Sequence, residues 1–211
     1  EREMTDIYTT DKKYSIIYAD PPWRYQHKGC KGAAEKHYAT MDMEGLIHLP
    51  IPRIADENCA LFLWTTFPKL EEELPLFKAW GFTYKTLGFS WIKTNPKDGK
   101  PFFGIGYYAK SNCEVCLMGI KGKMKPVSNK VSSCIISPRR EHSRKPDEVR
   151  ERIVELFGDI PRIELFARES MSGWDCWGNE TEKFNADLEH GRGQKALSRI
   201  NPRTERGLRN Y

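Results

Sequence analysis

The sequence predicts an α/β fold with an open, mostly parallel β-sheet and helices on both faces. Short β-rich runs alternate with helical patterns along the chain, which is the arrangement that builds such a sheet. Several of the runs are nearly continuous in apolar residues, as strands covered on both faces are. The length of 211 residues allows one domain with a substantial core and is too short for two comfortable ones.

The β-rich runs predict six strands, and the intervening segments predict two helices. The expected strands are Tyr14–Ala19, Cys59–Trp64, Thr86–Ile92, Glu114–Gly119, Ser133–Ile136 and Arg162–Phe166. Both expected helices, Pro68–Trp80 and Pro146–Phe157, have a proline near the first turn and a glycine directly after the end. Proline at the start and glycine past the end are the usual boundary signals of a helix.

Three long loops interrupt this pattern, and we expect the functional site among them. Residues 24–41 follow the first strand, residues 94–110 form a second loop, and residues 121–145 form a basic loop. Long loops in a compact domain are usually functional or disordered. In open α/β sheets, ligands bind beyond the carboxyl ends of the strands.

The composition is that of an intracellular globular protein. Hydrophobic residues make up 39% of the chain and charged residues 30%, which are ordinary proportions. No apolar run approaches the roughly 18 residues of a membrane helix, and the first residues lack the apolar core of a secretory signal. We therefore expect no membrane association, and a cytoplasmic protein in a bacterium or phage host or a nuclear one in a eukaryote.

The six cysteines favour core thiols over a metal centre. Only Cys113 and Cys116 have ligand-like spacing, and neither a second pair nor a nearby histidine completes a zinc site. Both lie in a run that reads as a buried strand, which suits thiols in a reducing compartment. No metal is therefore expected.

Basic residues are concentrated in two segments. Residues 121–152 hold ten Lys and Arg against four acids, and the tail after Asn179 carries seven more. Such segments suit a polyanion, because each phosphate that is neutralised releases counterions. A solvated basic face without a partner explains the pattern equally well.

The tetrapeptide Asp20-Pro21-Pro22-Trp23 directly follows the first strand. The two prolines fix φ and lack N–H groups, so we expect their carbonyls to be rigid acceptors for which no local amide competes. Asp20 and the Pro21 carbonyl could then accept the two hydrogens of an amine on a flat base, while Trp23 stacks on that base. A simple proline-rich turn is the alternative interpretation, and the position at the strand end favours the site.

Seven motifs occur in an order that resembles the MT-A-seventy family of adenine-N6 methyltransferases. Besides the tetrapeptide they are His37-Tyr38-Ala39-Thr40-Met41, Leu61-Phe62-Leu63-Trp64-Thr65, Trp91-Ile92-Lys93-Thr94-Asn95, Arg144-Lys145-Pro146-Asp147-Glu148, Ile163-Glu164-Leu165-Phe166-Ala167-Arg168 and Trp177-Gly178-Asn179. The resemblance runs from about Tyr14 to Glu180. The small size is more similar to the bacterial and phage members, which are thought to modify DNA.

The resemblance implies a Rossmann-like methyltransferase fold with permuted motif order, and S-adenosyl-L-methionine as the cofactor. It implies a methyltransferase domain over residues 1–180, followed by a basic and partly flexible tail, 181–211. The catalytic motif would be Asp20, Pro21, Pro22 and Trp23. The residues implied at the cofactor are Asp6, Ile7, Asp20, Lys110, Glu164, Phe166, Arg168, Asn179 and Glu180.

The chain also departs from the family pattern, and these departures concern cofactor affinity. Ala167 stands where a glycine is frequent, Glu180 replaces a common glutamine, and Ser170-Met171 replace a His-Asn pair. The glycine-rich cofactor loop of ordinary methyltransferases is therefore missing.

Substrate contacts are expected from the loops. The residues that we assign to the substrate are His37, Tyr38, Lys93, Asn95, Arg139, Arg140, His142 and Arg144. For Lys93 and Asn95, scaffolding of the loop is an equal alternative, and for the basic cluster a solvated loop is the rival.

The function predicted from the sequence is transfer of a methyl group from S-adenosyl-L-methionine to the N6 amine of adenine in DNA. The target base would have to be flipped out of a duplex or already single-stranded. The alternatives are an RNA methyltransferase, a catalytically silent nucleic-acid-binding subunit, and a methyltransferase for a small molecule or protein. A monomer, a homodimer and a complex with a partner subunit all fit the sequence.

Overall fold

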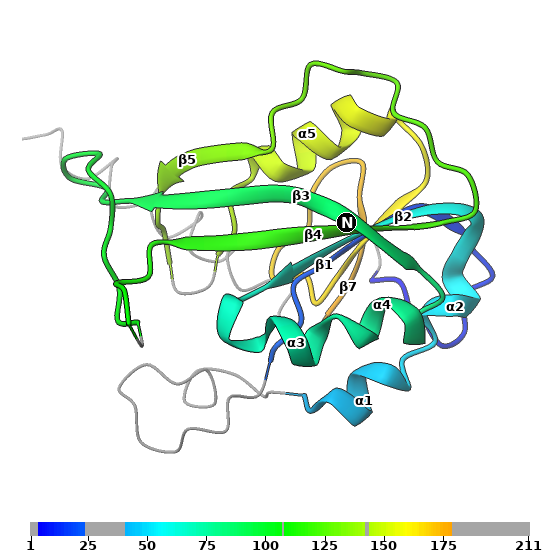
Figure 1. Ribbon diagram of the computed structural model, residues 1–211. Coiled ribbons are helices and arrows are strands. Elements are labelled where there is room, and N and C mark those ends of the chain that lie inside the picture. The colour runs from blue at the N-terminus through cyan, green and yellow to red at the C-terminus, as the bar shows by residue number, and fades with distance from the viewer. Residues whose placement is uncertain (1–3, 24–40, 107, 142–143, 179–211) are drawn as a thin grey trace, which may run out of the picture.

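The computed structural model describes residues 4–23, 41–106, 108–141 and 144–178, and within them seven strands form one sheet (Figure 1). The strands are β1 (Tyr14–Ala19), β2 (Ala55–Thr65), β3 (Thr83–Thr94), β4 (Cys113–Lys121), β5 (Cys134–Pro138), β6 (Arg162–Leu165) and β7 (Asp175–Trp177). Their order across the sheet is β5-β3-β4-β2-β1-β6-β7. The helices are α1 (Met43–Ile47), α2 (Ile51–Ile54), α3 (Leu70–Glu73), α4 (Pro75–Ala79) and α5 (Glu148–Phe157), with a 3₁₀ turn at Phe67–Lys69.

The direction of β4 distinguishes this sheet from a fully parallel one. Pairings β1–β2, β1–β6, β3–β5 and β6–β7 are parallel, whereas β4 runs antiparallel to both β2 and β3. The expected α/β fold is confirmed, and the mostly parallel sheet is confirmed in part. Because β4 is reversed, its first residues lie beside the carboxyl ends of its neighbours: Val115 pairs with Thr65 and Cys113 with Ile92.

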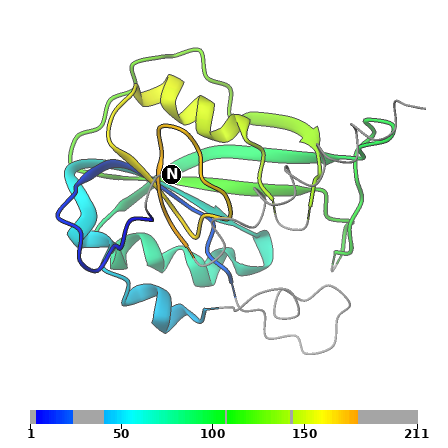
Figure 2. The ribbon, with the colours of Figure 1, turned by 180° about the vertical axis from the view of Figure 1, so that it is seen from behind.

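Helices cover both faces of the sheet, as Figures 1 and 2 show from opposite sides. Alternate residues of β1 point to opposite faces. Ile16 and Tyr18 belong to the core cluster that includes Val149, Ile153 and Phe157 of α5. Ile17 and Ala19 belong to the cluster under the other helices, which includes Leu46, Ile51, Leu76, Phe77 and Trp80. The continuous apolar run of β1 therefore has a partner layer on each side.

The observed elements differ from the expected ones mainly where the elements are short. The expected strand at Tyr14–Ala19 has the same bounds as β1, and the others are found with shifted ends. The expected helix Pro68–Trp80 is broken into the 3₁₀ turn, α3 and α4, because Pro75 has no N–H to continue α3 and instead begins α4. Three of the short elements, α1, α2 and β7, carry too little periodicity to be predicted.

Gly119 on β4 lies where α4 packs closely on the sheet, so a substitution there tests how tight this packing is. A Cβ at this position would lie 2.4 Å from Cδ1 of Phe77 and 3.2 Å from the carbonyl oxygen of Thr83. Phe77 is buried in the core beneath α4. We expect Gly119→Ala to lower the free energy of unfolding by about 1–3 kcal/mol through overpacking, measured by urea denaturation. The matched control Lys85→Ala, an exposed position on β3, should change it by less than about 0.5 kcal/mol.

Candidate active site

A half-buried cluster of charged side chains lies at the carboxyl edge of the sheet, directly after β1. Lys145, from the segment that follows β5, places its Nζ 2.9 Å from Oδ2 of Asp20 and 3.3 Å from Oε2 of Glu114. Lys93, at the end of β3, donates to the other oxygen of Glu114. Glu114 reaches this edge only because β4 is reversed. Four separate segments of the chain therefore meet in one cluster, in which Lys145 contacts Asp20 and Glu114, and Lys93 contacts Glu114.

The charges in this cluster hold one another in the ionised state. Burial alone would raise the pKa of Glu114, but Lys145 and Lys93 outweigh it and lower the pKa to about 2. Burial likewise opposes the charge of Lys145, and Asp20 and Glu114 overcome it and raise the pKa of Lys145 above its usual range. The stabilisation from Glu114 is thus present above its ordinary value of 4.5 and is lost as the pH falls toward 2. Lys145 stays protonated at neutral pH and donates hydrogen bonds rather than accepting a proton.

The backbone of the tetrapeptide corrects one prediction. The N–H of Trp23 donates to the Pro21 carbonyl over 2.9 Å, and the N–H of Met41 donates to the Pro22 carbonyl over 2.9 Å. The expectation that no local amide competes for these carbonyls is therefore wrong, because the prolines lack donors but the residues packed against them do not. A carbonyl oxygen has two lone pairs, so each retains capacity for a second donor.

Trp23 is held by its ring as well as by its backbone. Its side chain is 8% exposed, and its Nε1 donates to the carbonyl of Trp64 over 3.2 Å. The indole is a fixed wall of the site rather than a mobile side chain. Stacking of Trp23 on a base stays a prediction.

Several residues expected at the cofactor come together beside β6 and β7. Thr5 donates its N–H to the Cys176 carbonyl, which places the Asp6–Ile7 segment along β7. Ile7 is buried in the core, while the Asp6 carboxylate accepts from Tyr8 N and Thr9 Oγ1, each over 2.9 Å. Phe166 packs edge-on against Trp177 with 5.4 Å between ring centroids.

Phe166 ends β6 in an unusual conformation. Its φ of 60° lies in the left-handed region, which a bulky residue rarely adopts and which is enriched at functional sites. Gly178 then approaches this turn so closely that a Cβ would lie 2.6 Å from the Ala167 carbonyl oxygen. The turn after β6 is thus shaped by backbone-to-backbone contact, with Gly178 taking the place of the glycine that the motif lacks at Ala167.

Glu164 lies in an ion-pair network rather than at a free edge. Arg150 of α5 binds its carboxylate with two parallel hydrogen bonds, of 2.7 and 2.9 Å. Glu164 is 7% exposed, so its carboxylate is engaged within the protein. Its predicted place at the cofactor stays a prediction, and in this structure its pair with Arg150 joins α5 to β6.

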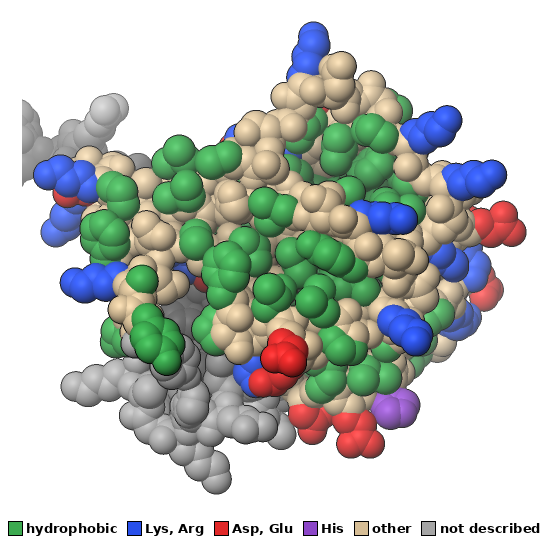
Figure 3. Space-filling view, in the orientation of Figure 1, with side chains coloured by type: hydrophobic (Ala, Val, Ile, Leu, Met, Phe, Trp, Pro, Cys, Tyr) green, Lys and Arg blue, Asp and Glu red, His purple; other side chains and the backbone are tan. Residues whose placement is uncertain are grey.

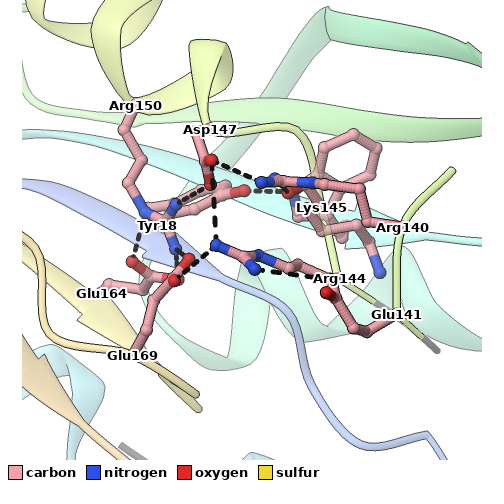
Figure 4. A network of polar contacts seen from close by, with 10 residues as sticks. Tyr18, Arg140, Glu141, Arg144, Lys145, Asp147, Arg150, Glu164 and Glu169 are labelled. Atoms are coloured by element: carbon pink, nitrogen blue, oxygen red, sulfur yellow. Dashed lines mark hydrogen bonds and ion pairs between the residues drawn. The ribbon is translucent and has the colours of Figure 1, made fainter. Parts of the chain in front are cut away.

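The network continues to the segment that carries Lys145 (Figure 4). Glu169, 4% exposed, accepts from Arg144 over 2.8 Å and lies 3.3 Å from Arg150. Arg140 pairs with Asp147 at 2.6 Å and also donates to the carbonyl of Lys145 over 2.8 Å. These contacts fasten the Lys145 backbone to α5 and to the loop after β6.

The other predicted site residues are found in different settings. Arg139 is exposed with its guanidinium 4.1 Å from the centroid of the Phe102 ring, whereas Arg140 and Arg144 are engaged with acids. Asn95 is half-buried at the base of its loop, Arg168 is half-buried near Lys145, and Lys110 is exposed. Among the described residues, the lysine that contacts the tetrapeptide is Lys145, not Lys110. Outside the described residues lie His37, Tyr38, His142, Asn179 and Glu180.

Sequence reasoning missed Lys145, Glu114 and Glu169 as site residues. Lys145 lies in one of the seven motifs, Arg144-Lys145-Pro146-Asp147-Glu148, but the sequence places it in a basic loop. Glu114 lies in an expected strand that would start at the opposite edge of a parallel sheet. For Glu114 the available signal is an isolated charge beside an apolar run, which usually marks a paired group. The sequence around Lys145 is charged on both sides and carries no such signal.

Glu73, the last residue of α3, is a further buried acid near this edge. It is 1% exposed, and neither carboxylate oxygen has a hydrogen-bond partner among the described residues. Burial raises the pKa of Glu73 to about 8, and the charge of Asp20 adds to the increase. Near neutral pH this side chain is therefore largely a neutral acid.

The described cysteines are all free thiols. Cys59, Cys116 and Cys176 are buried, as expected of core thiols, and burial raises the pKa of Cys116 well above its usual range. Cys134 is exposed, so the core interpretation is wrong for that residue, which lies on the edge strand β5.

Across the described ranges, no helix has the length and apolar character needed to span a membrane.

Comparison with known proteins gives a consistent set of similarities. The family model described as MT-A70, the MT-A-seventy family named above, matches residues 14–180. A type II methyltransferase, M.MunI, from a Mycoplasma species is 35% identical over 80% of this chain and 78% of its own length. The human N(6)-adenine-specific methyltransferase METTL4 is 28% identical over 86% of this chain and 40% of its length.

The name of a fungal relative specifies RNA as its substrate. The N6-methyladenosine RNA methyltransferase MTA1 of Cryphonectria parasitica is 27% identical over 81% of this chain and 52% of its own length. This chain therefore spans about half of the fungal relative and well under half of the human one.

Glu73→Gln should raise the free energy of unfolding at alkaline pH. The unfolded carboxyl ionises near its ordinary value of 4.5 and the folded one at about 8, so unfolding releases a proton between these values and stability falls as the pH rises. We expect the advantage of Glu73→Gln to be about 2–4 kcal/mol larger at pH 8.5 than at pH 4.5, measured by urea denaturation. The exposed neighbour substitution Glu71→Gln is the control, and an equal pH trend in that variant would contradict the assignment.

The Arg144–Glu169 pair should show strong coupling in a double-mutant cycle. Either single substitution, Arg144→Gln or Glu169→Gln, removes the 2.8 Å ion pair of a largely buried charge and should cost about 2–4 kcal/mol. The weaker contacts of Glu169 with Arg150 and of Arg144 with Glu141 remain in these variants. The double variant should recover about 1–3 kcal/mol of that sum. The pair Arg53–Asp11, in which both side chains are exposed, provides the comparison, with coupling under about 1 kcal/mol. Additive costs for Arg144 and Glu169 would show that the two side chains do not interact in solution.

Proposed function

Because this chain belongs to the MT-A70 family of adenine-N6 methyltransferases, we propose that it methylates the N6 amine of adenine in DNA with S-adenosyl-L-methionine. The observation that carries the proposal is the position of Asp20, which follows β1 directly and is fixed by the protonated Lys145 at the carboxyl edge. Ligands of open α/β sheets bind at this edge.

Asp20 and the Pro21 carbonyl are suited to hold an exocyclic amine. Lys145 binds Oδ2 of Asp20, which leaves Oδ1 to accept one amine hydrogen, and the second lone pair of the Pro21 carbonyl accepts the other. These two bonds orient the nitrogen and draw its lone pair out of conjugation with the ring. As the nitrogen forms its bond to the methyl carbon, the bond from that carbon to the cofactor's sulfur would break and leave a neutral thioether. The nitrogen must also lose one proton, which Asp20 could accept and pass to water.

The cofactor would supply an electrophilic methyl group, and the residues beside β6 and β7 fit it. The rings of Phe166 and Trp177, which pack on the core that contains Ile7, could line an adenine moiety, with Asp6 at its edge. Arg168 supplies a cation near Lys145 for a carboxylate. Since Lys145 also faces Asp20, the chain's own charges would bring the two reactants to the same place, and positioning of this kind lowers a barrier substantially.

DNA is favoured over RNA by the degree of similarity. The chain is 35% identical to the Mycoplasma type II methyltransferase and 27% identical to the fungal RNA methyltransferase. The retained acid and aromatic ring of the tetrapeptide argue against a silent binding subunit. RNA is the alternative substrate, and the fungal relative is the observation in its favour.

Asp20→Asn should reduce methyl transfer by about 100-fold or more while leaving the protein folded. The measurement is label transfer from S-adenosyl-L-methionine to matched single- and double-stranded DNA and RNA. Asp159→Asn, an exposed position before β6, is the control and should keep full activity. If adenine is labelled in RNA alone, RNA would replace DNA as the proposed substrate. Full activity in Asp20→Asn would refute the role given to this carboxylate.

A further inference from the structure

The β3–β4 loop, residues 95–112, rises from the edge that carries the charged cluster (Figure 1). Its base is fixed by backbone contacts: Phe102 N donates to the Lys93 carbonyl over 2.8 Å, and Gly104 N to the Ser111 carbonyl over 2.6 Å. Lys93 and Glu114, on either side of the loop, both belong to the charged cluster. The loop is thus a rigidly rooted arm beside the proposed active site.

The outer part of this arm exposes large apolar side chains. Phe103 is 61% exposed, Ile105 is 97% exposed and Tyr108 is fully exposed. Phe102, in contrast, is half-buried and packs under Arg139. Single exposed apolar residues are ordinary, but three within six positions at the end of one arm leave a substantial apolar area in water. In Figure 3 hydrophobic side chains lie beside Lys and Arg on the projecting side of the molecule.

The charges around these side chains indicate what they contact. Lys97, Lys100 and Lys110 are exposed on the same loop, against the single acid Asp98. Protein-binding surfaces are depleted in lysine, whereas contacts to a phosphate backbone require it. Aromatic and apolar side chains among lysines match a nucleic acid, whose bases offer apolar faces between charged phosphates.

We propose that Ile105, Tyr108 and Phe103 form an apolar wedge that contacts bases next to the target adenine, while the loop lysines contact phosphates. The inference rests on the proposed function and deepens it. An adenine that reaches Asp20 must leave its stack, and an inserted apolar side chain compensates the neighbouring bases for the lost stacking. The arm is rooted at Lys93 and Glu114, so the wedge projects from the same edge of the sheet as the site that would receive the base.

The test measures the Kd of the double variant Ile105→Ser/Tyr108→Ser for unmethylated genomic DNA, in native and in heat-denatured form. Genomic DNA is used because it presents every sequence context. Since both side chains are exposed, the variant should fold normally. Its Kd for native DNA is expected to rise about tenfold, with label transfer to native DNA falling at least as much. The matched control Tyr84→Ser/Val127→Ser removes exposed side chains elsewhere and should leave both values unchanged.

Binding is measured separately from methylation so that the two proposals fail in different ways. Wild-type protein that binds DNA without labelling it would overturn the proposed function, and the wedge would still stand on its effect on Kd. A variant with a Kd within twofold of wild type would overturn the wedge, whatever the activity. A wild-type dimer that dissociates in the variant, with unchanged DNA affinity, would assign these side chains to a second copy of the chain instead.

Discussion

A protonated lysine between two carboxylates holds the carboxyl edge of this protein together. Lys145 bridges Asp20, after the first strand, and Glu114, at the start of the reversed strand β4, and Lys93 closes the group. Burial would penalise each of these charges alone, and removing any one would leave the others uncompensated. The position of Asp20, and with it the proposed chemistry, therefore depends on an ion cluster that no single segment of the chain contains.

A second layer of ion pairs connects this cluster to the rest of the fold. Arg150 fastens α5 to β6 through Glu164, and Arg144 joins the Lys145 segment to the loop after β6 through Glu169. The proposed substrate side and the proposed cofactor side consequently share one network. A change at Glu169 reaches Lys145 through the backbone of a few residues, which explains why so many charges are buried in a small domain.

The parts of the fold that the sequence predicted are those governed by local pattern. β1 has the predicted bounds because six consecutive residues must be covered on both faces, and α5 begins and ends within two residues of its proline and glycine signals. The break in the helix at Pro75, the short helices α1 and α2, and the three-residue strand β7 depend on packing against distant segments. The seven ordered motifs predicted the family, because their residue types and order are specific even where their contacts are unknown.

The sequence by itself determined that Asp20-Pro21-Pro22-Trp23 ends a buried strand, since a carboxylate and two prolines after an apolar run allow little else. Only the tertiary structure decided what that carboxylate meets. The direction of β4 brings Glu114 to the same edge, and the fold of the segment after β5 turns Lys145 inward from a stretch that reads as a basic surface. The physical reason is that electrostatic pairing acts through space: residues 20, 114 and 145 are distant in the chain, and their charges are compatible with burial only once the sheet has placed them together.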